Sequence, residues 1–411
     1  MKIETLEKYA RLVIKTGVNL QQDQLLVISA PLECAAFSRA LAERAYQEGA
    51  RDVVVVWNDE QLARIRFLRA PEAVFAEYPD WQRDMYNFYV RQGAVFVSIA
   101  ASDPEVMKGV EPGRLSTAQK TRGQALKEYR ERLMRNENGW CVVSVPTPSW
   151  AMKVFTDVPE AEAMDRLEKA IAAAVRLDAE DPVTAWEEHK QNLRRNMNWL
   201  NEQHFRQLQY KNSLGTDVTV DLPEKHWWSG GAEHIRDGVE FVANMPTEEI
   251  FSMPQREGVN GKVVSALPLP YNGNLIENFS LTFRAGKVVD FTAEKGYDIL
   301  KGLLDTDEGS RYLGEVALVP WDSPINRQNI LFYNTLFDEN ASCHFALGKA
   351  YPSCLRGGSD MGPEELAAAG ANDSLTHVDF MIGTADLEIT GITDDGRAVP
   401  VFRQGNFTQE R

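Results

Sequence analysis

Residues 25–56 have the sequence LLVISAPLECAAFSRALAERAYQEGARDVVVV, and this stretch decides the fold of the N-terminal half. It begins with the apolar run 25–30 (LLVISA) and ends with the run 53–56 (VVVV), as expected for two buried parallel strands. Between the runs, Pro31 is placed to open a helix and Gly49 to close it. Strand, helix and strand in this order predict a βαβ unit.

The same alternation continues outward from this stretch. Two more apolar runs, 94–100 (AVFVSIA) and 141–145 (CVVSV), predict further parallel strands. Residues 159–205 are almost wholly helical in pattern, with a break at Asp181-Pro182, where a proline suits a helix start. We therefore expect a doubly wound α/β domain with a mainly parallel sheet over residues 1–180, and a second domain over 181–411.

The second half has the pattern of antiparallel hairpins. Residues 208–220 fold around Leu214-Gly215-Thr216, residues 279–291 around Ala285-Gly286, and residues 387–402 around Asp395-Gly396. Few helical patterns stand between them. The sequence therefore predicts a mixed α+β C-terminal domain.

Charge and apolar content exclude several partners. The 411 residues include 44 Lys and Arg against 60 Asp and Glu, a formal charge of -16, which repels phosphate backbones and anionic membrane surfaces. No window approaches 18 uninterrupted apolar residues, and Glu4 and Glu7 interrupt what would have to be the apolar part of a signal peptide. We expect no nucleic acid partner, no membrane partner and a cytoplasmic location.

The cysteines also indicate a cytoplasmic location. Cys34, Cys141, Cys343 and Cys354 form no CxxC pair, which predicts free thiols in a reducing compartment. Cys343 stands next to His344, but adjacent residues on a helix point about 100° apart, so a Cys/His nucleophile is disfavoured. No GxGxxG or GxxxxGKS/T loop follows a predicted strand, and no GxSxG elbow is present.

Candidate chemistry is concentrated in two histidine segments. In THVDFMIG, His377 and Asp379 are two residues apart in a strand-like run, so both side chains point to one side of the strand. In LFDENASCHFALGKAYP, Asn340 is a good N-cap for a helix whose early turns would carry His344. Tyr351 follows His344 by seven residues, which on a helix is the same face.

Two further carboxylates stand at comparable places. Glu315 lies inside the otherwise apolar YLGEVALVP, where it needs a partner to offset its desolvation, and Glu249 lies between two prolines in ANMPTEEIFSMP. Each of these residues could instead have a structural role without binding metal. Glu315 and Asp379 suit buried ion pairs, Glu249 suits a solvated loop, and a histidine on an apolar face is commonly a hydrogen-bonded core residue.

Charge balance favours metal. Four negative charges and two neutral imidazoles are supplied by Glu249, Glu315, Glu339, Asp379, His344 and His377. Two divalent cations would neutralise them, and a mixed oxygen and nitrogen shell suits Zn, Co or Mn. Sites with two metals about 3.5–4 Å apart occur in aminopeptidases and phosphatases.

The segments GTDVTVDL, NMPTEEIFSMP, RYLGEVALVP, LFDENASCHFALGKAYP and THVDFMIG together resemble the thermophilic-type metalloaminopeptidases, the family of aminopeptidases T and S. The resemblance covers nearly the whole chain, with the motifs in the same order and spacing. It implies that metal and active-site residues fall on Glu249, Glu315, His344, Tyr351, His377 and Asp379, with Glu339 a further ligand or a supporting residue. It also implies two metals per chain, a homodimer and peptide substrates of broad N-terminal preference.

The resulting expectation is a metal-dependent aminopeptidase whose catalytic domain is the C-terminal one. Two metals lower the pKa of a bound water and polarise the scissile carbonyl. Tyr351, as a hydrogen-bond donor to the tetrahedral intermediate, and Glu315 are the candidate catalytic residues. Two alternatives stay open: a two-metal phosphoesterase, although no Arg or Lys cluster stands beside the motifs, and a peptide- or metal-binding protein without turnover.

The aromatic segment HWWSGG has two interpretations. Trp227 and Trp228 suit a substrate pocket or a dimer contact, and core packing is at least as good an interpretation. His226 and His234, at its start and just beyond it, are expected to be structural or surface histidines.

Overall fold

A computed structural model describes residues 1–271 and 274–409. The chain forms two compact units, here called the N-terminal and C-terminal units. The N-terminal unit comprises Met1–Glu188, Ala232–Pro246 and Leu331–Leu336, and the C-terminal unit comprises His189–Gly231, Thr247–Ile330 and Phe337–Arg411. Each unit is described by itself.

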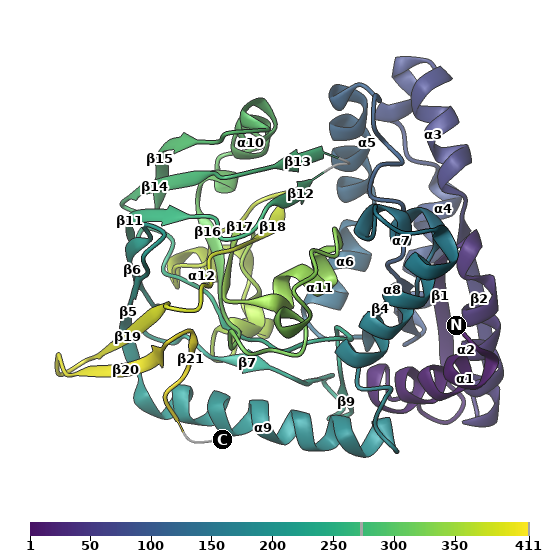
Figure 1. Ribbon diagram of the computed structural model, residues 1–411, viewed down its shortest axis with the longest axis horizontal. Helices are drawn as coiled ribbons and strands as arrows, with labels where there is room; N and C mark the ends of the chain where they lie inside the picture. Colours follow the sequence, from purple (N-terminus) through teal and green to yellow (C-terminus); the bar gives the residue numbers. More distant parts are fainter. Residues whose placement is uncertain (272–273, 410–411) are drawn as a thin grey trace. The chain divides into compact units, whose positions relative to one another are not determined.

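The N-terminal unit contains a four-stranded parallel sheet in the order β2-β1-β3-β4 (Figure 1). The strands are β1 (Leu25–Pro31), β2 (Asp52–Asn58), β3 (Val95–Ile99) and β4 (Trp140–Val143). These match the four predicted runs. Two details differ: β2 is an edge strand that is only half-buried, and Pro31 ends β1 while the helix begins four residues later, after a short 3-10 turn.

Helices pack on both faces of this sheet, because successive strand residues point to opposite sides. On one face Tyr9 of α1 stacks on Phe37 of α2, with ring centroids 4.8 Å apart. On the other face Val27 and Phe96 form a buried cluster with Val90 of α4. The helices are α1 (Ile3–Leu12), α2 (Ala35–Gln47), α3 (Glu60–Arg69), α4 (Asp80–Arg91), α5 (Pro112–Ala125), α6 (Lys127–Met134), α7 (Pro148–Val154) and α8 (Glu160–Ala174). The doubly wound α/β prediction is confirmed.

The two edges of this sheet differ. The Val142 N–H of β4 donates to Ala243 O at 2.7 Å and Val142 O accepts from Met245 N at 2.9 Å, so the returning segment covers that edge. This segment also holds the short pair β8 (Glu233–His234) and β9 (Glu240–Phe241). Within the part of the chain that the structure describes, no strand pairs with the outer edge of β2.

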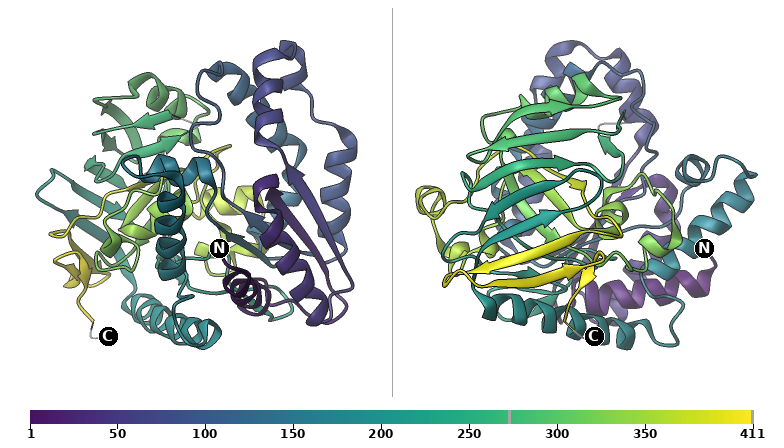
Figure 2. Two further views of the ribbon diagram at one scale, coloured as in Figure 1. Left: turned by 45° about the vertical axis from the view of Figure 1, so that its right-hand side comes forward. Right: turned by 60° about the vertical axis from the view of Figure 1, so that its left-hand side comes forward.

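The C-terminal unit contains an eight-stranded antiparallel sheet in the order β15-β14-β11-β6-β5-β19-β20-β21 (Figure 2, right). Its strands are β5 (Phe205–Lys211), β6 (Asp217–Asp221), β11 (Val259–Val264), β14 (Ser280–Arg284), β15 (Lys287–Thr292), β19 (Glu388–Thr393), β20 (Ala398–Arg403) and β21 (Asn406–Phe407). All three predicted hairpins are present as β5-β6, β14-β15 and β19-β20. In the β14-β15 turn Gly286 has φ 78°, and an added Cβ would overlap Arg256 O, so only glycine fits there.

A second sheet in this unit has the strand order β18-β17-β16-β10-β7. Its strands are β7 (Ser229–Gly230), β10 (Ile250–Ser252), β16 (Leu313–Leu318), β17 (His344–Gly348) and β18 (His377–Met381). The remaining elements are α9 (Pro182–Gln203) and α11 (Thr335–Asp338), which both begin in the N-terminal unit, α10 (Tyr297–Leu304), α12 (Pro363–Ala368), and the pair β12 (Leu269–Tyr271) and β13 (Asn274–Ile276). The mixed α+β prediction is confirmed.

One core fills the space between the two sheets of the C-terminal unit. Tyr210 of β5 meets Phe345 of β17 edge-on at 5.0 Å, and Phe279, just before β14, lies 5.6 Å from Phe380 of β18. Trp228 is fully buried in the same core. Its role is therefore core packing.

The prediction of a helix that carries His344 and Tyr351 is wrong. α11 ends at Asp338, a 3-10 turn covers Glu339–Ala341, and the chain then enters strand β17 at His344. Every residue of β17 is buried, and it pairs with β16 on one side and β18 on the other. Two strand partners outweigh the local helical preference of a segment rich in Ala and Leu.

Among residues 1–271 and 274–409, no helix has the combined length and apolar content needed to cross a membrane.

Candidate metal centre

The register of the five-stranded sheet places the predicted ligands on one face. Glu315 of β16 is opposite Ala346 of β17, which is opposite Asp379 of β18. His344 is two residues from Ala346, and His377 is two residues from Asp379, so their side chains point the same way. The expected strand at His377 and Asp379 is confirmed.

Glu249 joins this face from a fourth strand. It immediately precedes β10, in which Phe251 is opposite Ala317 of β16, itself opposite His344. Glu249 is two residues from Phe251 and therefore has the same orientation. Thus four strands contribute to one cluster of side chains.

The opposite face of the same strands is apolar. Val316, Phe345 and Phe380 alternate with the ligand positions, and all three lie in the core between the two sheets. This alternation explains how carboxylates can stand in apolar strands: one face packs the core and the other gathers the polar groups.

The side-chain atoms form two groups that share Glu315. His344 Nε2 lies 3.2 Å from Glu249 Oε2 and 3.4 Å from Glu315 Oε1. His377 Nε2 lies 3.6 Å from Glu315 Oε2 and 3.4 Å from Asp379 Oδ1. In each group the three potential ligand atoms lie within 4.8 Å of one another. The two oxygens of Glu315 therefore face different imidazoles.

Backbone carbonyls orient both imidazoles. Nδ1 of His377 lies 2.7 Å from Lys349 O, and Nδ1 of His344 lies 3.4 Å from Ser342 O. When Nδ1 donates to these carbonyls, the neutral ring presents the Nε2 lone pair to the carboxylates. This second hydrogen bond is the usual support of a histidine that binds metal.

The charges of the cluster are strongly coupled. Burial raises the pKa of Glu315, with partial compensation by His344 and His377. Burial alone would lower the pKa of His377, but Asp379 and Glu315 raise it to about 9. Likewise Glu249 and Glu315 raise the pKa of His344 well above its usual range despite burial. Without cations, protons on the imidazoles balance the carboxylates, and divalent cations can take their place, so this donor set fits metal.

Glu339 lies at the margin of the cluster. It is in the 3-10 turn before β17, and its carboxyl group is outside both three-residue groups. Burial, followed by the charges of Asp379 and Glu249, raises its pKa well above the usual range. Glu339 is therefore subject to the charges of the cluster, although its carboxyl group belongs to neither three-residue group.

Tyr351 contacts the centre through its ring. The ring meets that of His377 edge-on at 4.9 Å, and that of Phe251 at 6.0 Å. Burial, together with the charges of Glu315 and Asp379, raises the pKa of the phenol well above its usual range. Tyr351 thus keeps its proton and remains a hydrogen-bond donor.

Sequence reasoning missed two residues at this centre. Phe251 was not singled out, although the alternation that places Glu249 on the ligand face also places Phe251 there. Asn340 was predicted to cap a helix, but it is completely buried and its Oδ1 accepts the Glu248 N–H at 2.7 Å. Only the long-range pairing of segments 92 residues apart reveals that role.

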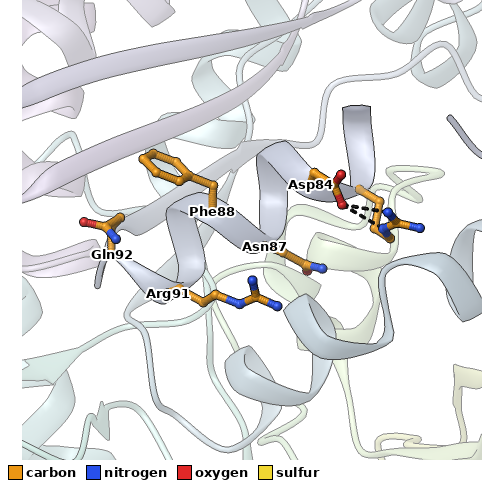
Figure 3. Close-up of a pocket in the computed structure, with 6 residues that line it drawn as sticks. Asp84, Asn87, Phe88, Arg91 and Gln92 are labelled. Carbon is orange, nitrogen blue, oxygen red and sulfur yellow. Dashed lines mark hydrogen bonds and ion pairs between the residues drawn. The ribbon is translucent and has the colours of Figure 1, made fainter. Parts of the chain in front are cut away.

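Other candidate sites do not gather comparable groups. Burial raises the pKa of the Cys343 thiol to about 12, which does not suit a nucleophile. His226 is buried with Nδ1 2.8 Å from Pro223 O, and His234 is exposed. A surface hollow of about 460 Å³ lies along α4 (Figure 3), lined by Arg83, Asp84, Asn87, Phe88, Arg91 and Gln92. It contains no predicted ligand.

An α/β unit and a mixed-sheet unit whose buried carboxylates and imidazoles lie close together indicate a protein of the metal-dependent class. The chain matches the thermophilic metalloprotease family M29 over residues 2–407, and it belongs to that family.

Named relatives agree over almost the whole chain. Aminopeptidase 2 of Geobacillus stearothermophilus is 51% identical over 405 residues, and aminopeptidase AmpS of Bacillus subtilis (strain 168) is 48% identical over 404 residues, each match covering 98% of both chains. The solved structure of wild-type AmpT from Thermus thermophilus is 40% identical, with a TM-score of 0.92 and 99% of both chains covered. The predicted family and the predicted class, a metalloaminopeptidase, are confirmed. The phosphoesterase and the non-catalytic alternative find no support in these relatives.

Proposed function

We propose that this protein releases N-terminal residues from peptides with the help of two divalent metal ions. The observation that carries the proposal is the position of Glu315, whose two carboxylate oxygens face two different imidazoles at 3.4 and 3.6 Å. A carboxylate in this position suits a ligand shared by two ions. The aminopeptidase names of the relatives support the substrate class.

The ligands divide into two sets. Glu249, Glu315 and His344 would hold one ion, and Glu315, His377 and Asp379 would hold the other. We also assign metal binding to Glu339, which is buried in the turn that leads to His344, beside the two three-residue groups. The mixture of imidazole nitrogen and carboxylate oxygen suits Zn, Co or Mn.

Two such ions lower the pKa of water toward neutrality and polarise a peptide carbonyl. Glu315 and Tyr351 have the remaining roles in this proposal. Glu315 keeps the two ligand sets at a fixed separation. Tyr351, held against His377 and Phe251, donates its phenolic proton in a hydrogen bond to the carbonyl oxygen as negative charge develops there. The buried setting strengthens that hydrogen bond.

A substrate panel tests the proposal. The panel contains a chromogenic aminoacyl anilide, the same compound with an acetylated amine, and an aromatic phosphate ester, each with and without a chelator. We expect only the free-amine anilide to be cleaved, and only without chelator. Equal cleavage of the acetylated compound, faster turnover of the phosphate ester, or activity in the presence of chelator would contradict the proposal.

We also propose that the protein is a cytoplasmic homodimer. All four cysteines are free and buried, which supports a reducing compartment. Strand β2 supplies a self-complementary edge. If β2 pairs antiparallel with its copy around Val55, Arg51 falls opposite Asp59, and Val53 falls opposite Trp57, so opposite charges meet at both ends of the pair.

A further inference from the structure

Asn340 occupies a special place between the ligand segments. It lies in the turn Glu339–Ala341, between Glu339 and the strand that begins at His344. Its side chain is fully buried. Its Oδ1 accepts the backbone N–H of Glu248 at 2.7 Å, and its Nδ2 lies 3.4 Å from Glu339 Oε1.

The Glu248 contact joins two strands that are not neighbours. Glu248 immediately precedes Glu249 and β10, whereas Asn340 precedes His344 and β17. In the sheet β16 lies between β10 and β17, so no backbone ladder connects them directly. Nevertheless Glu249 Oε2 and His344 Nε2 must approach to 3.2 Å across β16.

We propose that Asn340 is a positioning residue that sets the distance between Glu249 and His344, and so shapes one of the two metal sites. The inference rests on the two-ion function proposed above. The other site has separate support, because His377 and Asp379 share strand β18 and Lys349 O orients His377. Loss of the Glu248 contact therefore weakens binding at the site of Glu249 and His344 more than at the other site.

The chemistry of the amide explains why this position holds asparagine. The Glu248 N–H needs an acceptor, and the Glu339 carboxylate needs a donor. A side-chain amide offers both from a short, rigid stem. Aspartate keeps an acceptor for Glu248 but turns a second oxygen toward Glu339, and alanine removes both groups.

The test compares Asn340→Ala with a matched control. Asn201 is also buried, and its side chain similarly accepts from Trp228 N at 2.9 Å and donates to Trp228 O at 3.0 Å, just before β7, which pairs with the side of β10 opposite β16. Metal-free samples of the parent, Asn340→Ala, Asn340→Asp and Asn201→Ala are titrated with Zn²⁺ by calorimetry. Thermal unfolding is followed on the same samples.

The parent is expected to bind two ions per chain. Asn340→Ala should weaken the two ions unequally, with the more affected ion bound about 10-fold to 100-fold more weakly, the usual effect of losing a group that orients a ligand. Asn340→Asp retains the Glu248 contact but turns an oxygen toward Glu339, so it should bind the ion at Glu249 and His344 more tightly than Asn340→Ala does and less tightly than the parent. Asn201→Ala should unfold at a lower temperature and still bind both.

Each other outcome has a definite meaning. A parent that binds fewer than two ions would overturn the two-ion function and this inference with it. A parent that binds two, with Asn340→Ala unchanged, would overturn the role of Asn340 alone. Equal weakening by Asn201→Ala would show a general effect of destabilisation. If Asn340→Ala does not fold, equal weakening of both ions by Asn340→Asp would still contradict a role confined mainly to one site.

Discussion

Tyr351 is the residue whose hydroxyl can be removed with the least disturbance of its surroundings. Its ring packs on His377 and Phe251, and Tyr351→Phe keeps that ring. Metal content and unfolding temperature should therefore stay close to those of the parent. The kcat should fall by about 100-fold to 1000-fold, corresponding to about 3 kcal/mol, with a smaller change in KM. A kcat within a few-fold of the parent, measured with metal content on one sample, would reduce Tyr351 to a packing residue.

His377 makes the stability of the metal-free protein depend on pH. Asp379 and Glu315 raise its pKa from 6.5 to about 9, despite burial. A pKa raised on folding adds stability that is fully present below about pH 6.5 and is lost as the pH rises through about 9. The shift corresponds to on the order of 3 kcal/mol. The chelated parent should thus lose stability relative to His377→Gln between pH 6 and pH 9.5.

Urea unfolding of both chelated proteins at these two pH values measures this loss. Metal binding has the opposite dependence, because a ligand imidazole must be neutral, so ions should bind more tightly as the pH rises toward 9. A parent-minus-variant difference that is the same at both pH values would show that His377 is not protonated in the metal-free site.

At this scale, prediction from sequence worked where alternation is local. His377 and Asp379 are two residues apart, and a strand of any register puts them on one face. The neighbours of Glu315 and the contact between Asn340 and Glu248 depend on pairing between distant segments, which no local pattern contains. The distances on which we base the proposal that Glu315 is a shared ligand therefore required the structure.

Among the elements, β17 shows why a helix prediction can be wrong. The segment HFALGKAY lacks β-branched residues and has Ala, Leu and Lys, all good helix formers. In the structure β17 is a central strand with a partner on each side, and His344 opens it. Pairing supplied by β16 and β18 decides the conformation. Strand β18, rich in β-branched and aromatic residues, was predictable by itself.

Gly348 fixes the end of β17 opposite His377. Its φ is 109°, and an added Cβ would overlap Thr376 O. Gly348→Ala should lower the free energy of unfolding by about 2–4 kcal/mol, from a disfavoured backbone and from overpacking. Because the register at His377 is disturbed, the ion held by His377 and Asp379 should also bind more weakly.

Gly396→Ala is the matched control. Gly396 also has a positive φ, 83°, in the β19-β20 hairpin, but nothing lies within 4 Å of an added Cβ. It should cost only about 1–2 kcal/mol and leave metal binding unchanged. Chemical unfolding and zinc calorimetry on both variants give the comparison. Equal losses of stability and unchanged zinc affinity in both would contradict the role given to Gly348.

For the whole molecule, the sequence predicted both fold classes but not the path of the chain. Apolar runs and turn residues such as Gly286 and Gly396 are local signals, and they located the parallel strands and the hairpins. The assignment of Ala232–Pro246 and Leu331–Leu336 to the N-terminal unit depends on contacts far apart in sequence. The spacing of apolar residues in the sequence does not show that these two segments belong to the N-terminal unit.

The proposed dimer makes a prediction for the assembly. In antiparallel pairing of β2 around Val55, Arg51→Glu places a glutamate opposite Asp59 twice. Like charges at such positions cost about 0.2–1 kcal/mol per pair, so the dimer dissociation constant should rise by up to about 30-fold. Asp59→Asn in that background should restore much of the affinity, since asparagine still caps α3. A monomeric parent, or a dimer insensitive to Arg51→Glu in sedimentation, would contradict this pairing.

We propose that peptidase activity requires two ions that share Glu315. The most direct measurement is to remove metal with a chelator, return Zn, Co or Mn ions stepwise, and record bound metal by elemental analysis and cleavage of a free-amine aminoacyl anilide on the same samples. We expect no activity without metal and full activity as occupancy approaches about two ions per chain. Full activity in a preparation containing no transition metal or zinc would contradict it.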